Sequence, residues 1–439
     1  MSFSVEIYQN EYLPEGADEM HAVVRVTSSG GQTVVAPSEK AVVLVVDTSG
    51  SMDMPGNKIR EARHAAANAI RLLPDGTLFA LVAGSGVAEC VYPSKVQGLV
   101  RADNRTRSEA VEATRRLRAK GGTAISTWLD FVRDLEEPYP DAIRLAFLLT
   151  DGKNESEPPE VLAAAIQRAL GVFQCDTRGV GADYSDAELR KISDALLGRV
   201  DMIRTPEQMD TDFQAFMDCA IGKNIGDVRL RVWIAKGCAM KLLKQVVPDL
   251  IDLKPLAVPV NAQSAEVPIG AWSGHESRDY HLLVALPRCE VGLNMKVAGV
   301  SVVVGDASVG ENLVTAIWTD DLVRSTQVNR EVARCTGSEE LSDAIQEGLE
   351  ARDKGDAPTA TARLGRAVQI SMQNGDKPKL DQLLKVVDID GQGTVRLRDR
   401  ADELDVRELQ TGRTKQTVQL RQPAGSGLAN GSPGRGPAS

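Results

Sequence analysis

The stretch AVVLVVDTSGSM, residues 41–52, opens with six consecutive apolar residues and closes with a group of small polar ones. The apolar run is typical of a strand that is buried on both faces of a parallel sheet. Asp47 follows the run directly, and Ser49 and Ser51 come at intervals of two residues. In open sheets covered by helices, ligands bind beyond the carboxyl ends of the strands. The stretch therefore predicts a central strand with a polar binding loop at its carboxyl end.

The chain around this stretch alternates between apolar runs and amphipathic helical segments. The runs that predict strands are residues 41–46, 78–83, 143–149, 172–180 and 200–203, with a short antiparallel edge strand at 87–92. Apolar residues at helical spacing predict helices around residues 59–73, 161–170 and 187–197. Such alternation is the signature of helices packed on a parallel sheet. Residues 39–223 are therefore predicted to be α/β, with a doubly wound, mainly parallel sheet.

The segments that flank this unit have a different pattern. Residues 1–38 contain the strand-like runs FSVEIYQNEYL and MHAVVRVTSS, and residues 224–330 contain VRLRVWIA, DYHLLVAL and VAGVSVVVG. We expect these two segments to pair into one β-sandwich in which the α/β unit is inserted. Residues 331–390 predict three short helices. Residues 391–439 predict a C-terminal strand or linker, followed by a disordered tail rich in Gly, Pro and Ser.

Composition narrows the possible functions. The 439 residues carry a formal net charge of -10 and no long basic block, which argues against a nucleic-acid partner. No apolar run approaches the ~18 residues of a membrane helix, and the N-terminus shows no signal segment, so we expect a cytoplasmic protein without a membrane span. The six cysteines include no C-x-x-C pair and no histidine cluster beside them. They are expected to be reduced thiols, with neither a zinc site nor a disulfide framework.

Two later loops carry polar residues of the same kind as the first. Thr123 follows a glycine pair in GGTAIS, residues 121–126, and Asp151 follows the apolar run LAFLLT, residues 145–150. Carboxylate and hydroxyl oxygens with few charges are suited to Mg²⁺, which prefers oxygen ligands and keeps several waters. The three loops together predict a metal site beyond the carboxyl ends of the strands.

The order and spacing of these residues resemble the metal-ion-dependent adhesion site of the von Willebrand factor A family, in its bacterial multidomain type. The resemblance covers roughly residues 39–223 and rests on Asp47, Ser49, Ser51, Thr123 and Asp151. It implies that the serines and the threonine contact Mg²⁺, or Mn²⁺ or Ca²⁺ in its place. It also implies that one or both aspartates act directly or through water. An Asp or Glu of a partner protein would then fill an open position on the metal.

Parts of the sequence also fit structures of other kinds. A lone D-x-S-x-S fits an Asx turn or a helix cap as well. Asp53 and Asp75 stand in turn contexts and are interpreted as solvated rather than as ligands. The segment VDIDGQGTVRLRD, residues 387–399, lacks several ligands of a calcium loop and is interpreted as a turn between a helix and a strand. No phosphate-binding loop or dinucleotide fingerprint is present, so nucleotide binding is not predicted.

The predicted function is a non-enzymatic, metal-dependent protein-interaction module. Ser49 and Ser51 do not stand in a G-x-S-x-G turn, and Ser49 occupies the position where an aspartyl phosphatase would have a second acidic residue. No histidine follows in the order that a hydrolase of this fold would need. The alternatives that stay open are a metal-dependent hydrolase and an adaptor subunit of a ring-shaped (AAA-type) ATPase.

The segment DELDVRELQTGRTKQTVQL, residues 402–420, places Thr411, Thr414 and Thr417 among charges just before the tail. One interpretation is a solvated strand or linker. The other is that accessible threonines are phosphorylated and then recognised by a forkhead-associated domain through charge-assisted hydrogen bonds. Bacterial proteins that this chain resembles often accompany Ser/Thr kinases and such domains, which supports the second interpretation.

Overall fold

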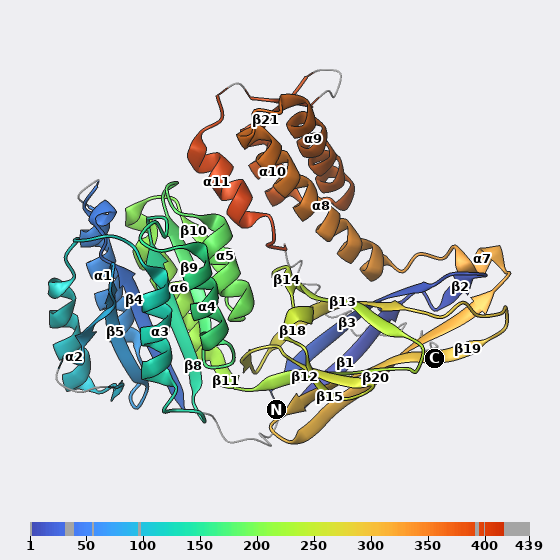
Figure 1. Ribbon diagram of the computed structural model, residues 1–439, viewed down its shortest axis with the longest axis horizontal. Coiled ribbons are helices and arrows are strands. Elements are labelled where there is room, and N and C mark those ends of the chain that lie inside the picture. Colours follow the sequence, from blue (N-terminus) through green and yellow to red (C-terminus); the bar gives the residue numbers. More distant parts are fainter. Residues whose placement is uncertain are drawn as a thin grey trace, which may run out of the picture.

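The computed structural model describes residues 2–30, 39–54, 57–94, 98–390, 395–398 and 400–416. Figure 1 shows three parts. The α/β unit comprises residues 39–222, and the two-sheet unit comprises residues 2–30 and 223–319. The helical segment, residues 330–412, lies across the top of both in this view. Each part has a hydrophobic core of its own.

The α/β unit is built on one sheet with the strand order β10-β9-β8-β4-β5-β6, and β7 also pairs with β5. The strands are β4 (Lys40–Asp47), β5 (Leu78–Gly84), β6 (Glu89–Tyr92), β7 (Val100–Arg101), β8 (Ile143–Thr150), β9 (Gln174–Val180) and β10 (Val200–Ile203). Strands β10, β9, β8, β4 and β5 are parallel, whereas β6 and β7 run antiparallel to β5. The predicted α/β class with a mainly parallel sheet is confirmed.

Helices cover both faces of this sheet. They are α1 (Lys58–Leu72), α2 (Asn104–Ala113), α3 (Ile125–Glu136), α4 (Pro159–Ala169), α5 (Asp186–Ala195) and α6 (Met209–Gly222), with 3₁₀ turns η1 (Gly50–Asp53), η2 (Thr114–Arg116) and η3 (Pro206–Gln208). Alternate residues of β4 face opposite cores. Leu44 and Val46 pack with α1, α2 and α6, whereas Val43 and Val45 pack with α3, α4 and α5. Burial on both faces explains why residues 41–46 of β4 are all apolar.

The connections of the sheet reverse direction between β4 and β8. These two strands are neighbours, but the chain passes from β4 to β5 on one side and from β8 to β9 on the other. A crevice forms at such a switch point because the two connections leave in opposite directions. Strand β4 ends at Asp47 and β8 ends at Thr150, so both carboxyl ends meet at this point.

The two-sheet unit surrounds the α/β unit in sequence. One sheet has the order β1-β3-β18-β13-β14 and the other β15-β16-β12-β19-β20-β2, and β11 pairs with β17. The strands are β1 (Ser2–Gln9), β2 (Tyr12–Pro14), β3 (Glu19–Ser29), β11 (Lys223–Ile225), β12 (Val228–Ile234), β13 (Ala239–Val247), β14 (Ile251–Asp252), β15 (Val258–Asn261), β16 (Ser264–Pro268), β17 (Trp272–Ser273), β18 (Glu276–Ala285), β19 (Asn294–Val304) and β20 (Ala307–Thr319), with a 3₁₀ turn η4 (Lys254–Leu256). The two larger sheets share one core, in which Val24 and Leu282 of the first pack with Leu230 and Val300 of the second.

The helical segment follows a short helix, α7 (Leu322–Ser325). Its elements are α8 (Arg330–Asp353), α9 (Ala357–Asn374), α10 (Lys377–Val386), the hairpin β21 (Val387–Ile389) and β22 (Val395–Leu397), and α11 (Glu403–Gly412). Asp402 caps α11, and Leu409 is buried in one cluster with Leu383 and Leu364 of the neighbouring helices. The prediction of a strand or linker is therefore wrong for residues 403–412. Within the described ranges, none of the helices is both long and apolar enough to cross a membrane.

The end of α11 buries two of the three tail threonines. Thr411 and Thr414 are 1% and 7% exposed. The Thr411 hydroxyl lies 2.7 Å from that of Tyr184, and Arg190 donates a 2.8 Å hydrogen bond to Thr414 Oγ1. The expectation that these two threonines are accessible for phosphorylation is wrong, because α11 and the turn that follows it pack them against the α/β unit. Thr417 and the predicted disordered tail lie outside the described residues.

Candidate metal site at the carboxyl edge of the sheet

Asp47 closes β4 and is completely buried. The Ser49 amide donates a 2.6 Å hydrogen bond to Asp47 Oδ1, and Thr150 Oγ1 donates one of 2.5 Å to Asp47 Oδ2. The carboxylate is thus fixed by its own loop and by the end of the neighbouring strand. The Gly50 amide donates to the Gly121 carbonyl at 2.9 Å, which ties this loop to the one that carries the predicted threonine.

A chain of hydrogen bonds joins the first loop to the loop after β8. Ser49 Oγ lies 3.0 Å from Ser51 Oγ, and Ser51 Oγ donates a 2.6 Å hydrogen bond to Asp151 Oδ1. Asp151 is fully buried and lies 100 residues from Ser51 in the sequence. The topology therefore brings the two halves of the predicted set into direct contact.

Thr123 approaches the same point from the third loop. A Cβ atom added to Gly152 would lie 3.3 Å from Thr123 Oγ1 and 3.4 Å from Ser51 Oγ. Both hydroxyls therefore lie close to Gly152, the residue that follows Asp151. Ser156 holds the threonine loop in place, because its Oγ accepts a 3.0 Å hydrogen bond from the Thr123 amide and its amide donates to the Thr123 carbonyl at 3.2 Å. All five predicted residues therefore lie around one edge of the sheet.

The chemistry of this set fits a hard divalent cation. The side chains offer two carboxylates and three hydroxyls, all oxygen donors. Burial raises the pKa of Asp47 to about 6, although hydrogen bonds from Thr150 and Ser49 oppose the rise, and the charge of Asp151 adds to it. Burial destabilises the ionised form of this carboxylate. A positive charge nearby would stabilise that form.

Lys58, which no motif in the sequence marks, completes the site. Its Nζ donates a 2.6 Å hydrogen bond to Asp151 Oδ2, and the two side chains are 9% and 0% exposed. Lys58 is the first residue of α1, shortly after the loop that carries the serines. The site therefore contains two carboxylates and one ammonium group, and it carries a net negative charge when all three are ionised.

The loop after β8 also supports the threonine loop through the start of α3. Asn154 Oδ1 accepts a 3.0 Å hydrogen bond from the Ile125 amide, and Glu157 Oε1 accepts one of 2.9 Å from the Ser126 amide. Asn154 Nδ2 in turn donates to Glu157 Oε1 at 2.7 Å. These contacts satisfy amides that the first turn of a helix leaves without partners. They also fix the position of Thr123 relative to Asp151.

Asp53 and Asp75 are exposed to solvent, as the sequence predicts. Asp53 is exposed in the turn η1. The Asp75 side chain is 78% exposed and pairs with Arg107 at 2.6 Å. Asp75 precedes β5, at the opposite end of the sheet from the five clustered residues. It is therefore a useful control for charge changes at the site.

The histidines make their contacts elsewhere in the described part of the chain. His64, on α1, lies 3.1 Å from the Asn68 side chain, and His21 and His281 hydrogen-bond each other within the two-sheet unit. His275 also belongs to that unit. Among the described residues, no hydrogen bond joins a histidine to the five clustered residues or to Lys58. The arrangement offers oxygen ligands but no imidazole base.

Comparisons with known proteins agree with this architecture. Residues 40–202 match the family described as the von Willebrand factor type A domain. The chain is 30% identical over 164 residues to inter alpha-trypsin inhibitor heavy chain 4 of Mus musculus, a match that covers 35% of this chain and 17% of that protein's length. The structure of the ArnB paralog VWA2 from Sulfolobus acidocaldarius covers 94% of this chain and 98% of its own, with a TM-score of 0.58 and 16% identity, which shows a shared fold.

A much stronger similarity extends over the whole chain. The structure of a von Willebrand factor type A protein from Catenulispora acidiphila is 42% identical, covers 95% of this chain and 97% of its own, and superposes with a TM-score of 0.91. The similarity includes the two-sheet unit and the helical segment as well as the α/β unit, since little of either chain is left unmatched. The domain match, the fold and this full-length relative together show that the chain belongs to the von Willebrand factor type A family.

Proposed function

We propose that this protein is a non-enzymatic module that binds a partner protein through a divalent cation at the carboxyl edge of the α/β sheet. The observation that carries the proposal is the hydrogen-bonded chain from Ser49 through Ser51 to Asp151. Ser49, Ser51 and Thr123 would hold Mg²⁺ with their hydroxyl oxygens, and Asp47 and Asp151 would act directly or through water. The bound cation supplies an electrophilic position that an Asp or Glu of the partner can occupy.

The charge of the site supports recruitment of an external carboxylate. Neutral hydroxyls contribute no charge, and Lys58 offsets one of the two carboxylates. A divalent cation held by this set would keep a net positive charge, so an additional anionic ligand is favoured. Mn²⁺ or Ca²⁺ could replace Mg²⁺, since both also accept oxygen ligands.

The partner interaction should depend on the metal. We expect the full-length protein, immobilised and exposed to a lysate of its native host, to retain a partner in Mg²⁺ and to lose nearly all of it in EDTA, because the metal forms the bridge. Adding Mg²⁺ back should restore binding. Quantitative mass spectrometry of the retained proteins measures the effect, and Asp75→Ala serves as the control for Asp47→Ala. A partner that stays bound in EDTA and also binds Asp47→Ala would contradict a metal bridge.

The rival function is a metal-dependent hydrolase. The absence of a histidine among the hydrogen-bond partners of the described site residues argues against it, since general-base catalysis would then fall to a carboxylate or to water. A panel of phosphoester and peptide substrates tests this directly. Mg²⁺-dependent turnover that disappears in Ser49→Ala would replace the proposed function with an enzymatic one.

A further inference from the structure

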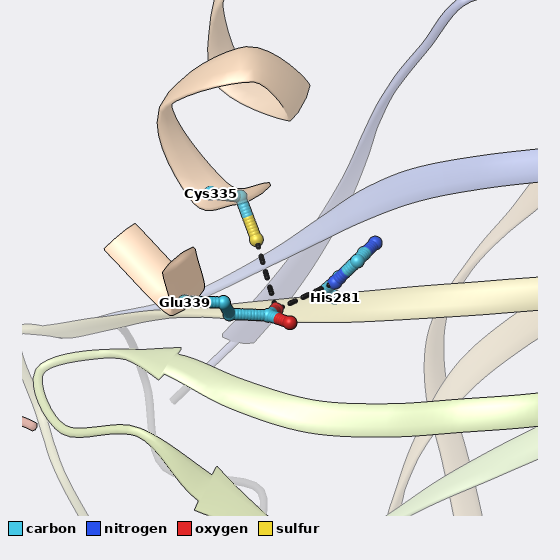
Figure 2. A group of neighbouring side chains, drawn as sticks. All are labelled: His281, Cys335 and Glu339. Atoms are coloured by element: carbon cyan, nitrogen blue, oxygen red, sulfur yellow. Dashed lines mark hydrogen bonds and ion pairs between the residues drawn. The ribbon is translucent and has the colours of Figure 1, made fainter. Parts of the chain in front are cut away.

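A second group of ligand-type side chains lies where the helical segment meets the two-sheet unit. Figure 2 shows His281, from β18, facing Cys335 and Glu339, from α8. One ligand atom from each residue lies within 4.8 Å of the other two. His281 Nδ1 is 2.6 Å from Glu339 Oε1, and Cys335 Sγ is 3.8 Å from the same oxygen. The spacing of four residues on α8 places the thiol and the carboxylate on one face of the helix.

The group is largely shielded from water. His281 and Cys335 are each 2% exposed, and the Glu339 side chain is 15% exposed. Val23, Val246 and Val332 pack with Cys335 in a small apolar cluster. Burial raises the pKa of the Cys335 thiol, and the charge of Glu339 raises it further. A thiol in these surroundings needs a cation beside it to become a thiolate.

Neighbouring side chains contact both the imidazole and the carboxylate of the group. His21 Nδ1 lies 3.0 Å from His281 Nε2, and the two rings are stacked with centroids 5.2 Å apart. Histidine ligands of metals usually donate the other ring N–H to a neighbouring acceptor, and His21 Nδ1 is placed to accept it. That tautomer makes the lone pair of His281 Nδ1 available to a metal. Lys244 Nζ lies 3.6 Å from Glu339 Oε2, the carboxylate oxygen that does not face His281.

We propose that His281, Cys335 and Glu339 form a binding site for Zn²⁺ that fastens α8 to β18. A nitrogen, a sulfur and an oxygen donor make up a set that zinc accepts in proteins, whereas Mg²⁺ and Ca²⁺ prefer oxygen alone. Three protein ligands leave a fourth position for water. The thiolate and the carboxylate together balance the charge of the dication, and the released thiol proton passes to solvent.

An ion pair between His281 and Glu339 would not require the cysteine. The same junction also holds a second network, in which Asp279 accepts hydrogen bonds from Arg25 at 2.7 Å and from Arg334 of α8 at 2.7 Å. This network joins α8 to the sheet independently of His281. The Cys335 thiol adds a third ligand-type group to this pair, because it donates a 3.8 Å hydrogen bond to the carboxylate oxygen that also faces the imidazole.

Co²⁺ provides a spectroscopic test of this site. The full-length protein carrying Asp47→Ala is titrated with Co²⁺, so that the oxygen-ligand site at the sheet edge is removed from the measurement. We expect one equivalent to produce a thiolate-to-Co²⁺ charge-transfer band and the visible absorption of a tetrahedral ion, and Zn²⁺ to displace it. Adding Cys335→Ala should remove the charge-transfer band. Cys175→Ala, at the other fully buried cysteine, should retain it.

Thermal unfolding gives a second, independent measurement. Zn²⁺ should raise the Tm of the Asp47→Ala protein by several degrees, since a ligand that binds only the folded state stabilises it. The same shift is expected when Cys175→Ala is added, and none when Cys335→Ala is added. The proposal is overturned if one equivalent of Co²⁺ gives no thiolate band, or if the band persists in Cys335→Ala. Because Asp47 is replaced throughout, neither outcome bears on the proposed partner-binding function.

Discussion

Asp47→Ala is expected to abolish divalent-cation binding at the carboxyl edge of the α/β sheet. The substitution removes one of only two carboxylates, and it also removes the acceptor for the Ser49 amide and the Thr150 hydroxyl. The serine loop then loses the anchor that fixes its hydroxyls. Loss of an outer-shell partner alone costs a metal site ~10–100-fold in affinity, so removal of this residue should cost at least ~100-fold. Calorimetric titration with Mg²⁺ or Mn²⁺ measures the change.

Two further variants separate metal binding from folding. Asp47→Asn keeps an oxygen that can accept one of the two hydrogen bonds, yet it lacks the charge, so it should fold and still fail to bind. Asp75→Ala makes the same change in charge at the opposite end of the sheet and should bind as the wild type does. Equal heats for the wild type and Asp47→Ala would show that the cation, if any, binds elsewhere.

The central strands of the α/β unit could be predicted within a few residues of their observed bounds. Strands β4, β5 and β8 are buried on both faces, so each contains a run of at least five consecutive apolar residues, although Arg144 interrupts the start of β8. The polar residues after β4 and β8 could then be placed together, because parallel neighbours end at the same edge of the sheet. The placing of these two loops follows from the spacing of the apolar residues and from the order of the strands along the chain.

Three helices of the same unit, α2, α3 and α6, were not predicted. The sequence of α3 does contain the signal, because Ile125, Trp128, Leu129 and Val132 recur at helical spacing and are all buried. Helix α2 offers much less, since its buried apolar residues are the alanines Ala110 and Ala113. Small side chains bury well but contribute little contrast to an apolar pattern.

Contacts between distant parts of the chain could not be predicted from pattern alone. Lys58 meets Asp151 across 93 residues, and His281 meets Glu339 across 58. Thr411 is polar and surrounded by charges in the sequence, yet α11 buries it against Tyr184 of the α/β unit. Each of these contacts depends on how whole helices and strands pack against one another. The spacing of apolar residues within one element gives no information about this packing.

Lys58→Met is expected to strengthen Mg²⁺ binding, because Lys58 competes with the metal for the Asp151 carboxylate. The ammonium group lies 2.6 Å from Asp151 Oδ2 in a buried position and offsets one of the two negative charges of the site. A like charge ~4 Å from a cation costs a few kcal/mol even at an effective dielectric constant near 20. Replacing it with an apolar side chain of similar length should tighten Mg²⁺ binding at least ~10-fold, or about 1.4 kcal/mol.

The same substitution should destabilise the folded protein when no metal is bound. Removing one partner of a buried ion pair leaves an uncompensated charge and costs about 3–5 kcal/mol, so the unfolding free energy of Lys58→Met should fall in EDTA. Mg²⁺ should restore much of it, since the cation replaces the missing ammonium. Lys241→Met makes the same change at an exposed ion pair of the two-sheet unit and should alter neither quantity appreciably. If Lys58→Met instead weakens Mg²⁺ binding, Lys58 acts by positioning Asp151 for the metal rather than by competing with it.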